Sequence, residues 1–515
     1  MSDSTTILPP DTNAPSRVAP VPLGTKVAAG AGEAVINVGI NLPKNFAFPI
    51  YNLILGVNPT LLGIALFIPR IWDAVLDPLM GSISDNTRSR WGRRKPYMLA
   101  GGLLTALAVG LLCFFPRGMH ERLGEGVMFG FSHGDLFYAG YLMVMSMLFY
   151  TVMTVFAVPY GALTMELTSD YADRTRVMSF RTFFTYGSGL LIGWLYAIAS
   201  ADWAILKDPV TGQPDPIRGS YAVGVLLIVV LLVCSMLPTL FVREPVNVRT
   251  QQQPKIPVLR GLAETLRSRA FLLVVAAYTI GFLAVIMVIG LGQYVNYYHV
   301  YGGDLATGSF VQGWAHTFAV LCGIGATIAI NRLARRVEKK ALLIGALCFP
   351  LVGGALSWFV YSPDLPTWTF RTELFGAIPL NLSIHPLAIS YMLIWPGLAG
   401  LLIMSNSIIA DLCDVDELNT GRRREGMYWA VFSWIQKTAI SVALLFSGVI
   451  LDLVGFDAKL PAQSEQTIWS MRLAYMLVVC LGALSAIALV SMIPINRQRI
   501  AEVNAALERR RLESN

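Results

Sequence analysis

Two aspartates lie inside an apolar stretch of the chain that is long enough to span a bilayer. Asp73 and Asp77 fall within residues 66–80. Their spacing of four residues puts both carboxylates on one face of a helix. A charged side chain at the centre of a bilayer costs about 3 kcal/mol on insertion scales. We therefore expect a partner for the pair, namely a bound cation, a proton or a basic side chain, and the pair indicates an ion-coupled membrane protein.

Apolar segments recur along the whole chain. The sequence of 515 residues is 55% hydrophobic and only 14% charged, whereas about one quarter of a soluble protein is charged. Each segment is close to the 20 residues that cross a bilayer. We predict an all-α membrane protein with twelve transmembrane helices, at residues 29–55, 59–84, 96–116, 136–166, 177–203, 219–242, 270–298, 307–333, 340–361, 386–412, 425–453 and 468–493.

The distribution of lysine and arginine predicts the orientation in the membrane. With the N-terminus inside, the inner tails and loops hold 28 of the 39 basic residues and the outer loops hold six. Cytoplasmic loops are enriched in these residues, so we predict a multi-pass protein of the cell (inner) membrane with both termini in the cytoplasm. The net charge of +7 then follows from topology, and no nucleic-acid partner is expected.

A basic linker divides the predicted spans into two sets of six. We predict a disordered cytoplasmic tail at 1–28, a six-helix bundle at 29–242, a linker at 243–269, a second bundle at 270–493 and a cytoplasmic tail at 494–515. Short basic loops follow span two and span eight, at the same place in each half. This faint repeat suggests a transporter with a central cavity. Six scattered cysteines without a CxxC pair indicate neither a disulfide framework nor a metal site.

Several other ionisable residues lie within the predicted spans. Lys437 is about twelve residues into span eleven and needs an anion, either the two aspartates across the halves or an anionic substrate. Arg70, one turn before Asp73, offers the alternative of a structural salt bridge. Arg181 opens span five, as a cavity residue or an interfacial anchor. Lys44 shares a face of span one with Glu33 and could snorkel outward, and a lone His316 is more often packed than functional.

The loop after span two carries five basic residues within 85–96. Ordinary positive-inside charge explains it, but cations also favour helix C-termini. We therefore identify Asp85, Arg88, Arg93 and Arg94 as candidate gating residues that hold one access state and separate in the other.

Three segments resemble the glycoside–pentoside–hexuronide:cation symporters, a branch of the major facilitator superfamily. They are residues 70–81 with 87–96, residues 410–426 followed by Lys437, and residues 158–163 with Arg181. The similarity runs over nearly all of residues 30–495. It implies a major facilitator fold of twelve helices with alternating access. It also implies that Asp73 and Asp77 bind the coupling cation, Na⁺ or H⁺, that Lys437 lies near that site, and that Arg181 lies at the base of the cavity.

Two departures from the family leave the substrate open. The sugar permeases carry acids at positions that fall on Asn37 and Ala157 here. The lysophospholipid symporters of the same superfamily also keep the cation acids and the lysine, and they too lack the sugar acids. The resemblance therefore implies the transport mechanism without fixing the sugar.

We predict a cation-coupled symporter of a glycoside-like or anionic organic solute, with Na⁺ or H⁺ as coupling ion and no cofactor. The alternative is a carrier of an amphipathic, lipid-like solute such as a lysophospholipid. An enzyme or a sensor is disfavoured, because no nucleophile–base set, phosphate loop or large soluble domain is present. We expect a monomer whose partners are a small-molecule substrate and membrane lipid. The predicted substrate contacts are polar or aromatic mid-span residues: Asn37, Ala157, Tyr160, Arg181, Gln293, Tyr294, Trp314 and Trp434.

Overall fold

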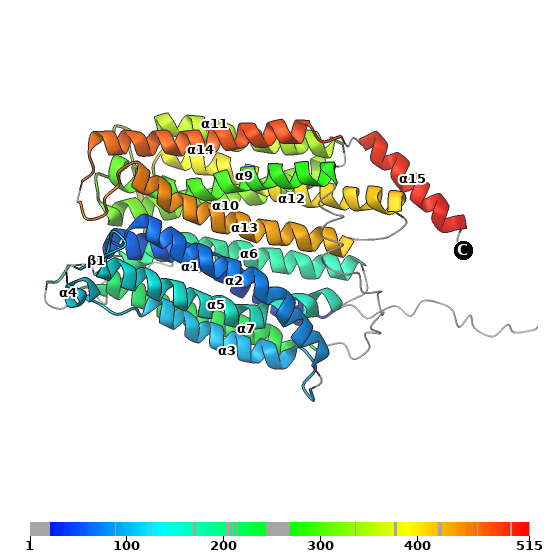
Figure 1. The fold of residues 1–515 in the computed structure, drawn as a ribbon, viewed down its shortest axis with the longest axis horizontal. Helices are drawn as coiled ribbons and strands as arrows, with labels where there is room; N and C mark the ends of the chain where they lie inside the picture. Colours follow the sequence, from blue (N-terminus) through cyan, green and yellow to red (C-terminus); the bar gives the residue numbers. More distant parts are fainter. Residues whose placement is uncertain are drawn as a thin grey trace, which may run out of the picture.

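The protein is a bundle of long helices whose axes run roughly in one direction (Figure 1). The computed structural model describes residues 21–513 except 88, 125, 168–170, 202–205, 209–210, 214, 244–267, 335, 375–377, 421–424, 461 and 495–496. The elements before the linker are α1 (Leu23–Phe46), the π-helical η1 (Ala47–Ile54), α2 (Pro59–Asn86), α3 (Lys95–Cys113), α4 (Met119–Leu123), β1 (Val127–Met128), β2 (Phe131–Ser132), α5 (His133–Glu166), α6 (Tyr171–Ala199) and α7 (Pro216–Phe241).

The elements after the linker have a similar order of long helices. They are α9 (Arg269–Tyr294), the π-helical η3 (Val295–Val300), α10 (Leu305–Leu333), α11 (Lys339–Val360), β3 (Trp368–Leu374), β4 (Ile378–Ile384), α12 (Leu387–Thr420), α13 (Glu425–Leu453), α14 (Glu465–Ser491) and α15 (Arg497–Glu513). The strands form two antiparallel hairpins, β1–β2 and β3–β4. We call the end of the bundle with the hairpins the hairpin end, and the end with Leu23 and α15 the terminus end.

Local sequence explains where the helices begin. The Asn58 side chain accepts a hydrogen bond from the backbone N–H of Leu61, and Pro59 takes the first helical position of α2. Asp215 caps α7 in the same way ahead of Pro216. Both are preferred start signals, because a side-chain oxygen satisfies a free N–H and proline lacks that N–H. The first residue of each of these two helices is therefore set by a capping residue in the preceding loop, and not by the length of the apolar segment alone.

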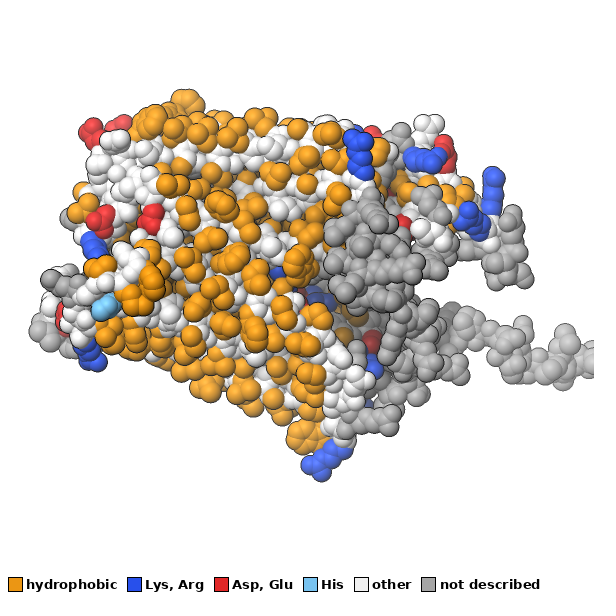
Figure 2. Space-filling view, in the orientation of Figure 1, with side chains coloured by type: hydrophobic (Ala, Val, Ile, Leu, Met, Phe, Trp, Pro, Cys, Tyr) orange, Lys and Arg blue, Asp and Glu red, His pale blue; other side chains and the backbone are white. Residues whose placement is uncertain are grey.

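Eleven of the described helices are long and apolar enough to cross a membrane. The mostly helical architecture confirms the predicted fold class. α1 is not among the eleven, since three asparagines and three charged residues lower its hydropathy. It nevertheless packs against α6 and α7, so a count of twelve spans stays a prediction that depends on α1. Figure 2 shows hydrophobic side chains covering the flank of the bundle, with basic atoms at its ends and in the seam between the halves.

The termini differ from the predicted tails. α1 already begins at Leu23, inside the segment 1–28 that we predicted to be disordered. Lys26 anchors this first turn through an ion pair of 2.6 Å with Asp173 at the start of α6. Residues 497–513, in the predicted C-terminal tail, form α15, and Arg510 donates to the Leu418 carbonyl of α12. The predicted linker lies almost entirely outside the described residues.

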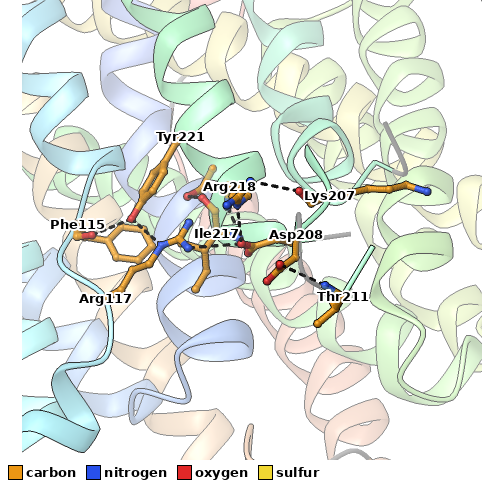
Figure 3. Close-up of polar contacts among 10 residues, drawn as sticks. Phe115, Arg117, Lys207, Asp208, Thr211, Ile217, Arg218 and Tyr221 are labelled. Atoms are coloured by element: carbon orange, nitrogen blue, oxygen red, sulfur yellow. Dashed lines mark hydrogen bonds and ion pairs between the residues drawn. The ribbon is translucent and has the colours of Figure 1, made fainter. Parts of the chain in front are cut away.

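The long helices pack in two sets. α1, α2, α3, α5, α6 and α7 contact one another, and α9 to α14 do the same. The principal contacts between the sets are α2 with α13 and α6 with α10. At the hairpin end of the first set, Arg117 lies 4.8 Å from the Tyr221 ring and pairs with Asp215 at 3.5 Å, which ties the end of α3 to the start of α7 (Figure 3).

Tight contacts join the two sets toward the hairpin end. A Cβ at Gly448 of α13 would meet the Pro59 carbonyl oxygen at 2.2 Å, so only glycine allows this approach to α2. Tyr294 donates to the Asn52 side chain at 2.7 Å, and Asn58 donates to Asp452 at 3.2 Å. The sets diverge toward the terminus end in Figure 1. The two halves are thus closed on each other at the hairpin end.

Candidate functional site

Asp73 and Asp77 meet Lys437 across the boundary between the halves. The ammonium of Lys437, on α13, lies 3.0 Å from Asp73 Oδ2 and also contacts Asp77 Oδ2. Asp73 is buried, with 1% of its side chain exposed, while 37% of the Asp77 side chain and 23% of the Lys437 side chain are exposed. One lysine therefore forms ion pairs with both carboxylates. The Asp77 side of this cluster is accessible from outside the protein, whereas Asp73 is not.

Two further groups from the first half hold Asp73. Thr154 of α5 donates to Asp73 Oδ1 at 3.0 Å, and Arg70 Nη1 lies 3.3 Å from Oδ2. Arg70 is itself fixed by the Ile40 carbonyl at 3.0 Å and lies over the Tyr150 ring at 4.6 Å. The structural salt bridge with Arg70 thus coexists with the Lys437 contact. A buried carboxylate needs such partners, because an unpaired buried charge is very costly.

The chemistry of this cluster suits a small cation or a proton. Two carboxylates and a hydroxyl offer the hard oxygen ligands that Na⁺ takes, and a proton would need only one carboxylate. Among the described residues, no group of three or more His, Cys, Asp or Glu side chains could hold a metal ion. An arriving cation would have to replace the Lys437 ammonium, since both occupy the same oxygens.

Arg181 is engaged by an acid in the first half. Its Nε and Nη2 lie 2.7 and 2.6 Å from Glu33 Oε2 on α1, and its Nη1 donates to Thr164 at 3.1 Å. The Glu33 and Arg181 side chains are 19% and 15% exposed. Glu33 compensates the charge of Arg181, so the guanidinium already has an anionic partner within the protein.

Two of the predicted substrate contacts are packing residues in this structure. Tyr160 is fully buried; its hydroxyl donates to the Ala29 carbonyl at 2.6 Å and its ring fills the space that Gly32 leaves on α1. Tyr294 is 1% exposed, and its hydroxyl is used by Asn52 in the contact between the halves. Both hydroxyls are engaged by protein groups in this structure, and a substrate role for either residue stays a prediction.

Asn37 and Ala157 lie near the centre of the first half. Asn37 donates to the Thr185 carbonyl at 3.0 Å and to the Ser188 hydroxyl at 2.9 Å, both on α6. Its carbonyl oxygen accepts from Asn41 one turn further along α1. Ala157 is half-buried on α5, three residues after Thr154. The side-chain amide of Asn37 therefore links α1 to α6 by hydrogen bonds, at a position where the resemblance implies an acid in the sugar permeases.

Gln293 lines a small polar cavity between the halves, whereas the two tryptophans lie apart from it. The cavity has a volume of about 30 Å³, enough for a water molecule but not for a sugar. Trp314 packs edge-on against Trp194 of α6 at 5.1 Å. Trp434 is 55% exposed on α13. The cavity is lined by Asn45, Ile192, Gly193, Tyr196, Ala197, Gln293, Tyr297, Ser309, Gln312 and His316.

The candidate gating residues that the structure describes lie at the terminus end of the first half. Arg94 Nη1 and Arg93 Nη2 lie 2.6 and 2.9 Å from Glu166, the last residue of α5. Arg88 lies outside the described residues, and the Asp85 side chain is not described. The second half has a comparable pair at its terminus end, Lys339 with Asp411 at 2.7 Å.

Sequence reasoning missed several members of the site. Thr154 carries no charge, and only its place on the Ala157 face of the same helix could have indicated it. Asn41, Asn45 and Gln312 are neutral polar residues within apolar spans, which the search for charges passed over. His316 was set aside as a packed residue, yet it lines the cavity.

A family model described as MFS/sugar transport protein matches residues 28–497. The chain belongs to this family. It is therefore a membrane transporter and not an enzyme, with a small molecule as its substrate. This bears out the resemblance seen in the sequence.

Curated relatives match the chain over most of its length. The chain is 25% identical to the uncharacterized symporter sll1374 of Synechocystis, with 94% of the chain and 96% of the relative covered. It is 23% identical to the glucuronide carrier protein homolog of Escherichia coli, with coverage of 95% and 96%. It is 24% identical to the mouse sodium-dependent lysophosphatidylcholine symporter 1, with coverage of 91% and 85%.

Among solved structures, the chain resembles a D-xylose-proton symporter with a TM-score of 0.54 at 14% identity. The match covers 92% of this chain and 98% of the other. At this identity the likeness shows the fold alone. Together with the family model it shows a major facilitator transporter.

Proposed function

We propose that the protein is a symporter that uses Na⁺ or H⁺ to drive uptake of a glycoside-like organic solute. The observation that carries the proposal is the position of Lys437 between Asp73 and Asp77, on the opposite half of the molecule. A cation that neutralises the carboxylates releases the lysine that holds them. The contact between α2 and α13 then changes with the charge of the site, which is what coupling requires.

We place the terminus end in the cytoplasm, because most of the basic residues gather there and cytoplasmic loops are rich in lysine and arginine. The halves are closed at the hairpin end, so this arrangement corresponds to the inward-facing state. The division into bundles 29–242 and 270–493, and action as a monomer in the inner membrane, remain part of the proposal.

Alternating access links the cation to the substrate. In the proposed cycle, cation binding from outside at Asp73 and Asp77 favours the outward-facing carrier that takes up substrate. The loaded carrier rocks inward, and Lys437 returns to the aspartates once the cation leaves. Opening to the outside has to break the Tyr294–Asn52 and Asn58–Asp452 contacts.

The alternative substrate is a lipid-like solute. The absence of acids at Asn37 and Ala157 and the likeness to a lysophosphatidylcholine symporter both favour it. Relatives named for glycosides and glucuronides favour the main proposal.

Counterflow in proteoliposomes tests the proposal. Purified protein would exchange labelled solute against a panel of glycosides, uronides and lysophospholipids, with and without Na⁺ and at several pH values. We expect exchange of at least one glycoside, and accumulation only with a cation gradient. Exchange of lysophospholipids alone would favour the alternative, and accumulation independent of any cation would contradict symport.

A further inference from the structure

An arginine and two tryptophans meet at the hairpin end of the second half, between α11 and α14. The guanidinium carbon of Arg472 on α14 lies 4.6 Å from the centre of the Trp358 ring, and that ring meets Trp469 edge-on at 6.4 Å. Arg472 Nη2 also donates to the Trp358 carbonyl at 2.6 Å. The two helices pack along each other at the outer edge of the bundle (Figure 1). We call these three side chains the Arg472 cluster.

The charge of Arg472 has no acidic counterpart in the part of the chain that the structure describes. Its hydrogen bond and its ring contact are both with Trp358, which is neutral. The Trp358 carbonyl lies in the last turn of α11, where carbonyls lack partners in their own helix, so the arginine satisfies this oxygen and keeps its charge. Nε is buried without a hydrogen-bond partner, and Nη1 makes no hydrogen bond with the described residues. Glu465 in the first turn of α14 is exposed and forms no ion pair with this guanidinium.

The first half holds the corresponding arginine in a different way. Arg117 follows the third long helix, α3, and lies 4.8 Å from the ring of Tyr221 on the sixth, α7. Arg472 likewise links the third and sixth long helices of the second half, α11 and α14. Arg117, however, pairs at 3.5 Å with Asp215, the residue that caps α7 (Figure 3). The cap of α14 is the neutral Ser464. The first half therefore supplies its own anion at this place, and the described residues of the second half do not.

The Arg472 cluster lies near the depth of lipid headgroups and away from the seam between the halves. α14 has 27 residues, about 40 Å of helix, close to the thickness of a bilayer with its headgroup layers. Arg472 is about 10 Å from the start of α14, and its side chain leans further toward that start. Trp469 is 53% exposed, and Phe359, next to Trp358, is 70% exposed. Since α11 and α14 are both candidate spans, these exposed rings border lipid, as tryptophan does at membrane interfaces.

We propose that the Arg472 cluster binds the phosphodiester group of a membrane phospholipid. A guanidinium presents its N–H groups in a planar fork that matches phosphate oxygens, and the phosphate supplies the anion that the second half lacks. Trp358 and Trp469 flank the glycerol and the first methylenes of an acyl chain. The chain then follows the exposed Leu477 and Leu481 along α14. In the orientation proposed above, this lipid belongs to the outer leaflet.

A transported solute does not suit this place. α11 and α14 make their principal contacts with elements of the second half alone, whereas the small polar cavity lies between the halves. A ligand at Arg472 therefore sits on the outside of the bundle, where the surrounding molecules are lipids. The inference adds a binding site to the protein and does not depend on symport.

Lipid binding by the purified, delipidated carrier in detergent tests the proposal. The Tm is followed against dioleoyl phosphatidylglycerol, against dioleoylglycerol, which has the same chains without the phosphate, and against inorganic phosphate. Of the three, we expect the phospholipid alone to raise the Tm. Arg472→Gln should need about tenfold more phospholipid for the same rise, the factor expected for one charge-assisted hydrogen bond. Arg472→Lys keeps the charge and should respond between the two.

Arg117→Gln is the matched control, because it removes the arginine that has its own aspartate, and it should respond to the phospholipid as wild type does. Trp469→Ala is a second variant that leaves Arg472 in place, and its exposed position makes a folding defect improbable. Native mass spectrometry counts the phospholipids that each variant retains. We expect Arg472→Gln and Trp469→Ala each to retain fewer than wild type.

Wild-type lipid response and retention in a folded Arg472→Gln would overturn the proposal. The same result in Trp469→Ala would do so where Arg472→Gln does not fold. Equal stabilisation by inorganic phosphate would overturn the assignment to a lipid, and an equal loss in Arg117→Gln would overturn the assignment to Arg472. Transport is not measured, so the proposed function stands or falls independently of these results.

Discussion

The two halves of the molecule contribute very different chemistry to its centre. The first half supplies Asp73, Asp77 and the compensated pair Glu33 and Arg181, held by hydrogen bonds among α1, α2, α5 and α6. Among the described residues at the centre, the second half supplies one charge, Lys437, and otherwise neutral groups such as Gln312 and His316. A fixed acid site in one half and a single removable counter-charge in the other make the seam between the halves sensitive to a cation.

Removing the acids should have the largest effect. Asp73→Asn and Asp77→Asn are each expected to abolish cation-driven accumulation, because the cation loses a carboxylate ligand. Exchange of substrate without a gradient should survive, since it does not require return of the empty carrier. Uptake driven by a cation gradient is compared with counterflow for each variant.

Asp304→Asn is the matched control for this prediction. Asp304 is exposed at the start of α10, and an asparagine there can still cap the helix as the aspartate does. Normal accumulation in both Asp73→Asn and Asp77→Asn would show that the asymmetry between the halves has no role in coupling.

Removing the single charge of the second half should destabilise the protein. Lys437→Ala leaves Asp73 with Arg70 and Thr154 and removes the ammonium from both aspartates. Breaking a buried pair costs about 3–5 kcal/mol, less here because Lys437 is partly exposed. A melting curve of the purified variant should show a lower Tm, and adding Asp73→Asn should recover part of the loss. A double variant no more stable than the weaker single one would argue against pairing across the halves.

The ion pair between Glu33 and Arg181 in the first half should stabilise the protein without a partner from the second half. Arg181→Gln leaves Glu33 partly buried without its partner, which we expect to cost about 1–3 kcal/mol of stability. The double variant Glu33→Gln, Arg181→Gln should regain stability, as seen in a double-mutant cycle of Tm values. Stability effects that simply add would show that the two side chains act independently, and would make Arg181 available to an anion.

The smallest expected effect lies at the terminus end. Hydrogen bonds from the Lys26 ammonium and from the Val21 N–H hold the pKa of Asp173 below its usual 3.8. The carboxylate form therefore stabilises the contact of α1 with α6 above that pH, and the stabilisation fades as pH falls below it. Hydrogen exchange at residues 21–30 should speed up on acidification below about pH 4. Lys26→Met should remove most of this dependence, and an unchanged pH profile would contradict it.

Charge and periodicity were enough to predict part of this molecule. The spans followed from apolar length, and the grouping of Asp73, Asp77 and Lys437 followed from the cost of isolated charges in lipid. The packing of Tyr160 and Tyr294 could not be predicted, because a mid-span aromatic looks the same in the sequence whether it packs or faces a cavity. Whether such an aromatic packs or faces a cavity depends on partners distant in sequence, which are Gly32 for Tyr160 and Asn52 for Tyr294.

The same limit applies to the basic residues. Sequence showed Arg181 and Glu33 but could not show that they meet across 148 positions of chain. The pairing of two charged side chains is a property of the fold, which spacing along the sequence does not reveal.

Cation binding to the purified carrier tests most directly whether Lys437 and the coupling cation compete for the two carboxylates. Calorimetric titration with Na⁺, and proton uptake measured across pH, would be compared for wild type and Lys437→Met, with Asp73→Asn, Asp77→Asn as the variant without a site. Competition predicts tighter cation binding in Lys437→Met, because the ammonium no longer occupies the oxygens, and none in the double asparagine variant. Unchanged or weaker binding in a folded Lys437→Met would contradict the displacement of this lysine by the cation.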